Sequence, residues 1–124
     1  MFSSGKSNQY DLEDRTHLFA KNVRALVKKL NKTISNIEDG KQLIRSSGSV
    51  GANYIEANEA LSKKDFLMRI KICRKEAKES RYWLRLIDTQ NKDELERERI
   101  DLENEATELM SIFGAILRKV ENKK

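Results

Sequence analysis

The stretch RSSGSVGANYIEANEALSKKDF, residues 45–66, decides how the fold of this chain is interpreted. It contains two glycines and four serines, although the residues on either side have the spacing of a helix. Small residues along one helix face let a second helix approach closely, at a helix-propensity cost of about 1 kcal/mol for each glycine. We therefore predict that Gly48 and Gly51 are packing residues in a helix that continues to about Ala60. On a helical wheel this helix has two adjoining apolar strips, one of Leu43, Ser47, Val50, Tyr54, Ala57 and Leu61 and one of Ile44, Gly48, Gly51 and Ile55.

Three more helices are predicted around this one. Asp11 is a candidate N-cap of the first, and Ser62 is a candidate N-cap of the third, with Asp65 in place of the capping-box glutamate. Four helices joined by short loops predict an all-α fold, an antiparallel up-down-up-down four-helix bundle over residues 12–122, after a disordered tail at residues 1–11. The predicted segments are a helix at about 12–32, a turn or frayed entry at 36–40, a second helix to about 60, a third at 63–87, the polar loop DTQNKD at 88–93 and a fourth helix at about 94–121.

Composition excludes several kinds of protein. The 124 residues include 36% charged residues and no proline, which is typical of long helices. No stretch has the roughly 18 uncharged apolar residues of a membrane span, and the N-terminus lacks a signal-peptide core, so we expect a soluble cytoplasmic protein. The single cysteine, Cys73, excludes an internal disulfide, and its apolar helix face predicts an inert buried thiol. With one histidine, His17, and no nucleophile beside an activating base, we predict no metal, no cofactor and no enzymatic activity.

Charge is unevenly distributed along the chain. The net charge is +5, but residues 62–87 sum to +6 and residues 92–122 to −4. Two explanations are open: the acidic fourth helix lies alongside the third and compensates it, or the basic face points outward and binds phosphates, with Tyr82 stacking on a base. The basic face of the third helix consists of eight cations that lie on one side of it: Lys63, Lys64, Lys71, Arg74, Lys75, Lys78, Arg81 and Arg85. The candidate nucleic-acid-binding residues are Lys71, Arg74, Lys75, Lys78, Arg81, Tyr82 and Arg85.

The second helix has a polar row beside its apolar strips. The row consists of Arg45, Ser49, Asn53 and Glu56. Its spacing fits either an ordinary solvated face or a hydrogen-bonded row at a contact between subunits. Trp83 lies off the main apolar stripe of the third helix and is expected to pack against another helix or subunit. These five residues are the candidate oligomer interface.

Three strings in the second and third helices have a familiar order. They are S-x-GAN-x-x-EA at residues 49–57, S-x-x-DF at 62–66 and KEA-x-E-x-x-YWL at 75–84. Together they resemble the four-helix bundle protein family, also called the 23S rRNA-intervening-sequence protein family. The resemblance implies an antiparallel four-helix bundle that assembles into ring-shaped homopentamers. A related group, the accessory proteins of diversity-generating retroelements, has a similar bundle, binds nucleic acid and partners a reverse transcriptase.

The sequence therefore predicts a non-enzymatic, ring-forming bundle that binds nucleic acid, RNA in particular, through its basic face without recognising base sequence. The alternative is a protein-protein interaction scaffold whose basic face binds an acidic partner. Salt-sensitive binding to arbitrary RNA favours the first function, and indifference to RNA favours the second.

Overall fold

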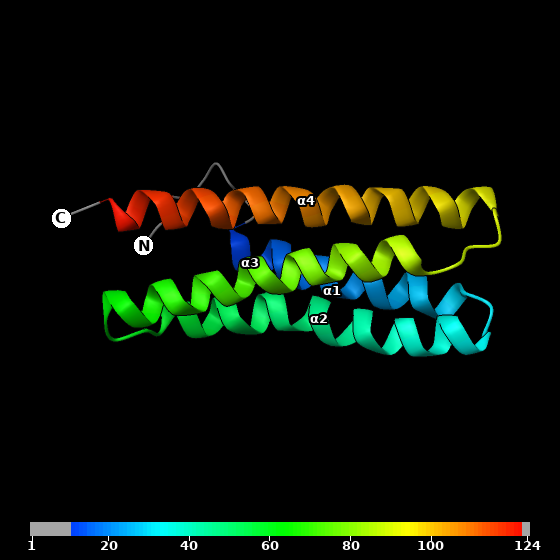
Figure 1. Ribbon diagram of the computed structural model, residues 1–124, viewed down its shortest axis with the longest axis horizontal. Helices are drawn as coiled ribbons and strands as arrows, with labels where there is room; N and C mark the ends of the chain where they lie inside the picture. Colours follow the sequence, from blue (N-terminus) through cyan, green and yellow to red (C-terminus); the bar gives the residue numbers. More distant parts are fainter. Residues whose placement is uncertain (1–10, 123–124) are drawn as a thin grey trace.

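The computed structural model describes residues 11–122, which fold into four long helices. They are α1 (Leu12–Lys29), α2 (Ile34–Asn58), α3 (Lys63–Leu86) and α4 (Asp93–Glu121). Consecutive helices run in opposite directions along the long axis (Figure 1), so the predicted all-α four-helix bundle is confirmed. The predicted tail, residues 1–11, lies outside the described residues except for Asp11. None of the helices between residues 11 and 122 is long and apolar enough to cross a membrane.

Two helix starts have the caps predicted from the sequence. Oδ1 of Asp11 accepts a hydrogen bond from the backbone N–H of Asp14 at 2.9 Å, at the start of α1. At the start of α3, Oγ of Ser62 accepts one from the backbone N–H of Asp65 at 3.0 Å. These N–H groups have no helical carbonyl within reach, so the side chains that satisfy them fix where each helix begins.

The connection between α1 and α2 differs from the prediction. α1 ends at Lys29 rather than near residue 32, because Oγ1 of Thr33 accepts a hydrogen bond from the N–H of Asn36 at 3.1 Å and starts α2 there. Residues 36–40 therefore belong to α2 and form no turn. The Asn36 side chain is 3% exposed and donates to the carbonyl oxygens of Asn31 at 3.0 Å and Asp88 at 2.9 Å. It also accepts from the Asp88 N–H at 2.9 Å, which ties the α1–α2 loop to the α3–α4 loop.

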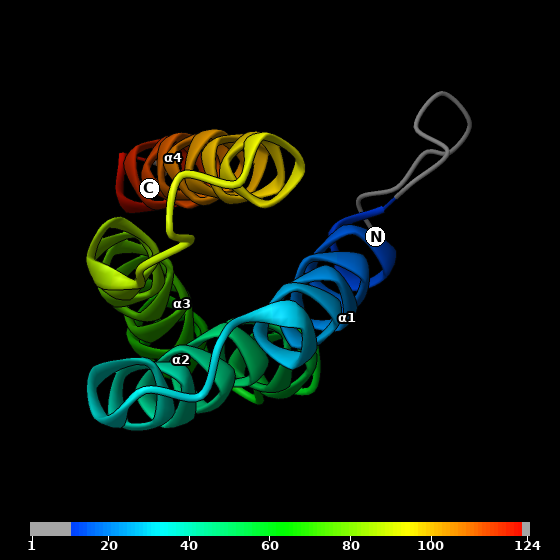
Figure 2. The same ribbon diagram turned by 90° about the vertical axis from the view of Figure 1, so that its right-hand side faces the viewer.

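The four helices enclose one apolar core. Viewed along the bundle they follow one another in the order α1, α2, α3, α4 (Figure 2). The contacts of α3 with α2 and with α4 are the most extensive, and those between α1 and α4 are the least. Cys73 is fully buried, and burial raises the pKa of its thiol to about 12, as expected of an inert cysteine. The largest fully buried side chains are those of Phe19, Phe113, Leu26, Leu43, Ile70, Leu84 and Leu109.

The two predicted strips of α2 differ in burial. The first strip is buried except for Leu61, which is 97% exposed because α2 ends at Asn58 and leaves Leu61 in the following loop. The prediction for Leu61 is therefore wrong. In the second strip, Gly51 faces α1, where an added Cβ would lie only 2.9 Å from Oγ1 of Thr16. This confirms the packing role of Gly51, whereas Ile55 at the end of the same strip is 46% exposed.

Candidate nucleic-acid interface

The polar row of α2 begins with contacts to α3 of the same chain. Nη1 of Arg45 lies 3.4 Å from Oε1 of Glu76, and its Nη2 donates a hydrogen bond to Glu79. Nε1 of Trp83 donates to the same Glu79 carboxylate at 3.0 Å. The hydrogen bond from Trp83, together with Arg45, lowers the pKa of Glu79 below its ordinary value. Both acidic residues in the middle of α3 are thus held on its α2 side.

The rest of the row follows the same seam between α2 and α3. Nδ2 of Asn53 donates to Oγ of Ser49 at 3.0 Å, and its Oδ1 accepts from Nη1 of Arg69 at 2.9 Å. Glu56, at the end of the row, is exposed. Arg45 and Asn53 therefore have partners on α3 within one subunit. The predicted contact of this row and Trp83 with a second subunit stays a prediction.

Two cations of the basic face of α3, Lys71 and Arg85, have acidic partners on α4. Nζ of Lys71 lies 3.7 Å from Oε2 of Glu121, and Nε of Arg85 lies 3.5 Å from Oε2 of Glu103. The side chains of these two cations are 61% and 63% exposed, so solvent screening leaves each pair little stabilising effect. At Lys71 and Arg85 the face is therefore compensated by the acidic helix, as the first of the two explanations predicted.

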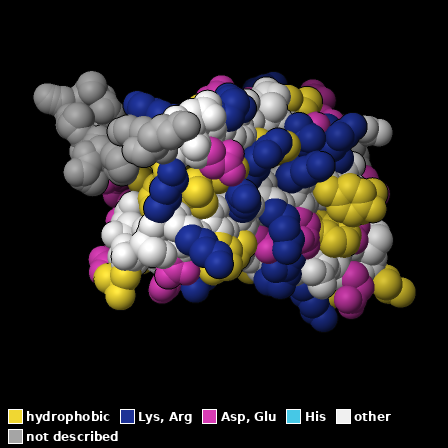
Figure 3. Space-filling model, turned by 60° about the vertical axis from the view of Figure 1, so that its left-hand side comes forward, with side chains coloured by type: hydrophobic (Ala, Val, Ile, Leu, Met, Phe, Trp, Pro, Cys, Tyr) yellow, Lys and Arg dark blue, Asp and Glu magenta, His cyan; other side chains and the backbone are white. Residues whose placement is uncertain are grey.

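The middle of the face has no such compensation. Arg81 donates from Nη1 to the hydroxyl of Thr107 at 3.3 Å, and this is a neutral partner. Arg74, Lys75 and Lys78, the central cations, are exposed, and none has a carboxylate within ion-pair distance among residues 11–122. Figure 3 shows Lys and Arg side chains gathered over one side of the molecule, with Asp and Glu scattered among them. The second explanation, cations that point outward, therefore applies to the middle of α3.

An exposed aromatic ring continues this face. Tyr82 follows Lys78 by one helical turn and is 57% exposed. Its ring packs edge-on against the indole of Trp83, with ring centroids 5.0 Å apart and an interplanar angle of 72°. The indole itself is partly buried against the core. Cations beside a supported, exposed aromatic ring are the combination that binds single-stranded nucleic acid by phosphate contacts and base stacking.

Arg118 lies beside the central cations and was not predicted as a site residue. A Cβ added to Gly114 would lie 3.5 Å from Nη1 of Arg118 and 4.0 Å from Nε of Arg74, so both arginine side chains lie close to this glycine. The signal in the sequence is that residues 111–120 contain no Asp or Glu, whereas residues 93–108 contain eight. Which part of α3 this acid-free stretch faces depends on how the two helices are aligned, and composition alone does not give that alignment.

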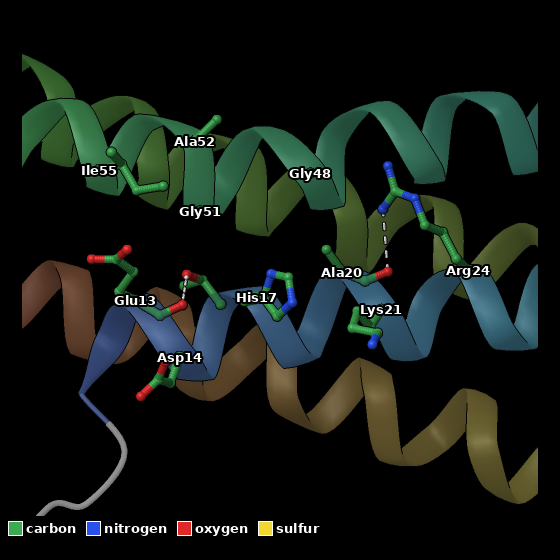
Figure 4. A pocket seen from close by; sticks show the side chains of 11 residues that line it. Glu13, Asp14, His17, Ala20, Lys21, Arg24, Gly48, Gly51, Ala52 and Ile55 are labelled. Atoms are coloured by element: carbon green, nitrogen blue, oxygen red, sulfur yellow. Dashed lines mark hydrogen bonds between the residues drawn. The ribbon is translucent and has the colours of Figure 1, made fainter.

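A groove of about 760 Å³ lies on a different part of the surface, between α1 and α2. Figure 4 shows His17 and Arg24 on α1 directed toward the small residues Gly48 and Gly51 of α2. The acidic lining residues, Glu13 and Asp14, lie toward one end of the groove and the basic ones, Lys21 and Arg24, toward the other, so the groove has no uniform attraction for phosphate. Within residues 11–122 there is no group of three His, Cys, Asp or Glu side chains that could hold a metal ion. The groove residues are Glu13, Asp14, Thr16, His17, Ala20, Lys21, Arg24, Gly48, Gly51, Ala52 and Ile55.

Comparisons with known proteins agree with the resemblance seen in the sequence. A family model described as "23S rRNA-intervening sequence protein" matches residues 8–115. A solved structure of a protein of unknown function from the S23 ribosomal protein family of Bacteroides thetaiotaomicron has a TM-score of 0.72 at 29% identity, covering 86% of this chain and 98% of that chain. No curated protein matches the chain. The family match includes the central cations and Gly114 and ends before Arg118.

Proposed function

This chain belongs to the 23S rRNA-intervening sequence protein family, and from that premise we propose that it is a non-enzymatic protein that binds RNA through the basic face of α3. The main support is that the central cations, Arg74, Lys75 and Lys78, are exposed and have no carboxylate within ion-pair distance among the described residues. Three neighbouring positive charges on one helix attract a phosphate backbone, and their binding releases condensed counterions. Such contacts hold RNA without recognising its sequence.

Single-stranded RNA is the form that this face suits. Tyr82 exposes its ring one turn beyond Lys78, and any unpaired base can stack on an aromatic ring, whereas bases inside a duplex are stacked on one another. Trp83 holds the tyrosine ring from its edge, which reduces the ordering that binding requires. The proposal therefore assigns phosphate contacts to the central cations and a base contact to Tyr82. It places this binding in the cytoplasm.

The proposal includes assembly into a ring of identical subunits, a homopentamer by the family resemblance. A ring repeats the basic face, so one RNA molecule can bind several faces and its affinity rises above that of a single face. Light scattering at micromolar concentration should then give several times the 14.4 kDa of one chain. Glu56→Ala should lower the assembled fraction while helical content by circular dichroism is retained. A monomer mass for the unaltered protein would contradict the ring.

The RNA proposal is tested by the salt dependence of binding. Fluorescence anisotropy with a mixed-sequence, single-stranded RNA gives the affinity at several salt concentrations. The triple variant Arg74→Gln, Lys75→Gln, Lys78→Gln keeps helix propensity nearly constant and so should remain folded. Each lost phosphate contact lowers the slope of log affinity against log salt by roughly 0.7 units for a single strand.

A matched control neutralises three other positions of the same face. The variant Lys71→Gln, Arg81→Gln, Arg85→Gln removes the same charge, but two of these cations already have carboxylate partners and the third has a hydroxyl partner on α4. It should reduce the slope by less than the central triple variant does. Equal slopes for the two variants, or no RNA binding by the unaltered protein at low salt, would contradict the proposal.

The alternative function is a protein-protein interaction scaffold. The observation that favours it is the exposure of hydrophobic side chains: Leu86, one helical turn after Tyr82 on α3, is 48% exposed, and Ile37, on α2, is 42% exposed. A scaffold that binds an acidic protein would show no affinity for RNA at low salt. The anisotropy measurement therefore distinguishes the two functions directly.

A further inference from the structure

Two arginines from different helices lie close to Gly114 of α4. The glycine is buried, and the position its Cβ would occupy is 3.5 Å from Nη1 of Arg118 and 4.0 Å from Nε of Arg74. One guanidinium comes from α3 and the other from the last turns of α4. Because glycine has no side chain, both head groups can approach the same point on the surface of α4.

No carboxylate of the described residues lies within ion-pair distance of either guanidinium. Among residues 11–122, Arg74 and Arg118 make no ion pair and no side-chain hydrogen bond. The other end of the same seam differs, because Arg85 there lies 3.5 Å from a carboxylate oxygen of Glu103. Residues 111–120 of α4 contain no acidic residue, and the carboxylate of Glu121, three positions after Arg118, lies 3.7 Å from Nζ of Lys71 instead. Like charges held close together repel, and a bound anion would remove that repulsion.

We propose that Arg74 and Arg118 together bind one phosphate group at the seam between α3 and α4. A guanidinium presents several N–H donors in a fixed plane and matches a phosphate with two parallel hydrogen bonds. Two such groups, one on each helix, contact the same phosphate from two sides. This inference rests on the proposed RNA-binding function and identifies the contact that anchors the RNA. The phosphate is either a backbone phosphodiester or the terminal monoester of an RNA strand.

The site can be tested without RNA. Thermal unfolding is measured in sodium phosphate and in sodium chloride at equal ionic strength. Phosphate should raise the melting temperature of the unaltered protein relative to chloride, and Arg118→Gln should remove most of this difference. The control is Arg97→Gln, which removes the same charge from an exposed position near the other end of α4. If Arg118 had only a structural role, such as its favourable interaction with the C-terminal end of the helix dipole, Arg118→Gln would change the melting temperature equally in both salts.

RNA binding then tests whether the two arginines share one phosphate. If they do, the double variant Arg74→Gln, Arg118→Gln loses one phosphate contact, and its salt slope falls by roughly 0.7 units. If each arginine binds its own phosphate, the slope falls by about 1.4 units, and the shared site is wrong. Comparing a 5′-phosphorylated RNA with the same RNA bearing a 5′-hydroxyl distinguishes the two phosphate sources. Only a terminal-monoester site gives a preference that disappears in Arg118→Gln.

The two proposals fail in different ways. If phosphate raises the melting temperature through Arg118 but the protein does not bind RNA, the proposed function is contradicted and the phosphate site is supported. RNA binding that Arg118→Gln and Arg97→Gln weaken equally, with no phosphate-specific change in melting temperature, would overturn the site and keep the function.

Discussion

Gly51 and Gly114 are glycines in the interior of two helices, and they face opposite surroundings. At the seam of α1 and α2, a Cβ on Gly51 would lie 2.9 Å from Oγ1 of Thr16, so the helices are already in close contact. At the seam of α3 and α4, a Cβ on Gly114 would meet only two arginine side chains, at 3.5 Å and 4.0 Å. At both glycines, side chains of other residues thus approach the helix backbone closely. Whether these are a packed neighbour or a pair of charged groups is decided by the helix across the seam.

The largest expected effect comes from filling the tight seam. Gly51→Leu places a branched side chain where not even a methyl group fits, so α1 must move away from α2. Overpacking of this kind costs about 1–3 kcal/mol of the free energy of unfolding. Urea denaturation followed by circular dichroism measures this loss. An unchanged urea midpoint would show that α1 and α2 can move apart at little cost. Gly51 would then be in no tighter contact than Gly114.

A smaller substitution at Gly51 tests whether Oγ1 of Thr16 is the atom that makes this contact tight. Gly51→Ala should destabilise the protein by about 1 kcal/mol, because the new methyl group meets the hydroxyl of Thr16. Thr16→Ala removes that hydroxyl, so the double variant should recover part of the loss, with a coupling energy of at least about 0.5 kcal/mol. Thr16→Ala alone is the control, since it also removes the hydrogen bond to the Leu12 carbonyl. If the losses in free energy of unfolding of Gly51→Ala and Thr16→Ala simply add in the double variant, the tight contact does not involve the Thr16 hydroxyl.

The smallest effect is expected at the other seam, with opposite sign. Gly114→Ala introduces a methyl group at ordinary contact distances from flexible arginine side chains. Alanine is the better helix former, so the free energy of unfolding should rise by about 0.5–1 kcal/mol. The same urea titration measures it. A loss of stability would mean that the arginine side chains cannot move aside, and the two seams would then be alike.

Most of the fold could be predicted from local sequence signals. Asp11 and Ser62 are caps in the structure as in the prediction, because a cap depends on residues only three positions apart. The start of α2 was missed, since Thr33 follows a short break without glycine or proline. Leu61 was assigned to an apolar strip of the second helix because the helical wheel was extended past the end of α2. Both errors concern helix ends, where periodicity gives no information.

The candidate site was predictable only in part. The basic face of α3 follows from the spacing of its own residues, as does the position of Tyr82 beside it. The partners do not, because the distance of Lys71 from Glu121 or of Arg85 from Glu103 depends on the alignment of α3 against α4. Arg118 was missed for the same reason. A charge pattern within one helix gives the candidates, and the neighbouring helix decides which of them remain available.

The Asn36 side chain has a consequence for local unfolding. It bonds the backbone of the α1–α2 loop at Asn31 and that of the α3–α4 loop at Asp88, so the two loops are joined through one side chain, and moving that side chain breaks hydrogen bonds to both. Local opening at this end of the bundle should then be one cooperative event. In hydrogen exchange, amide protons in the two loops would have similar opening free energies despite lying more than fifty residues apart in the chain.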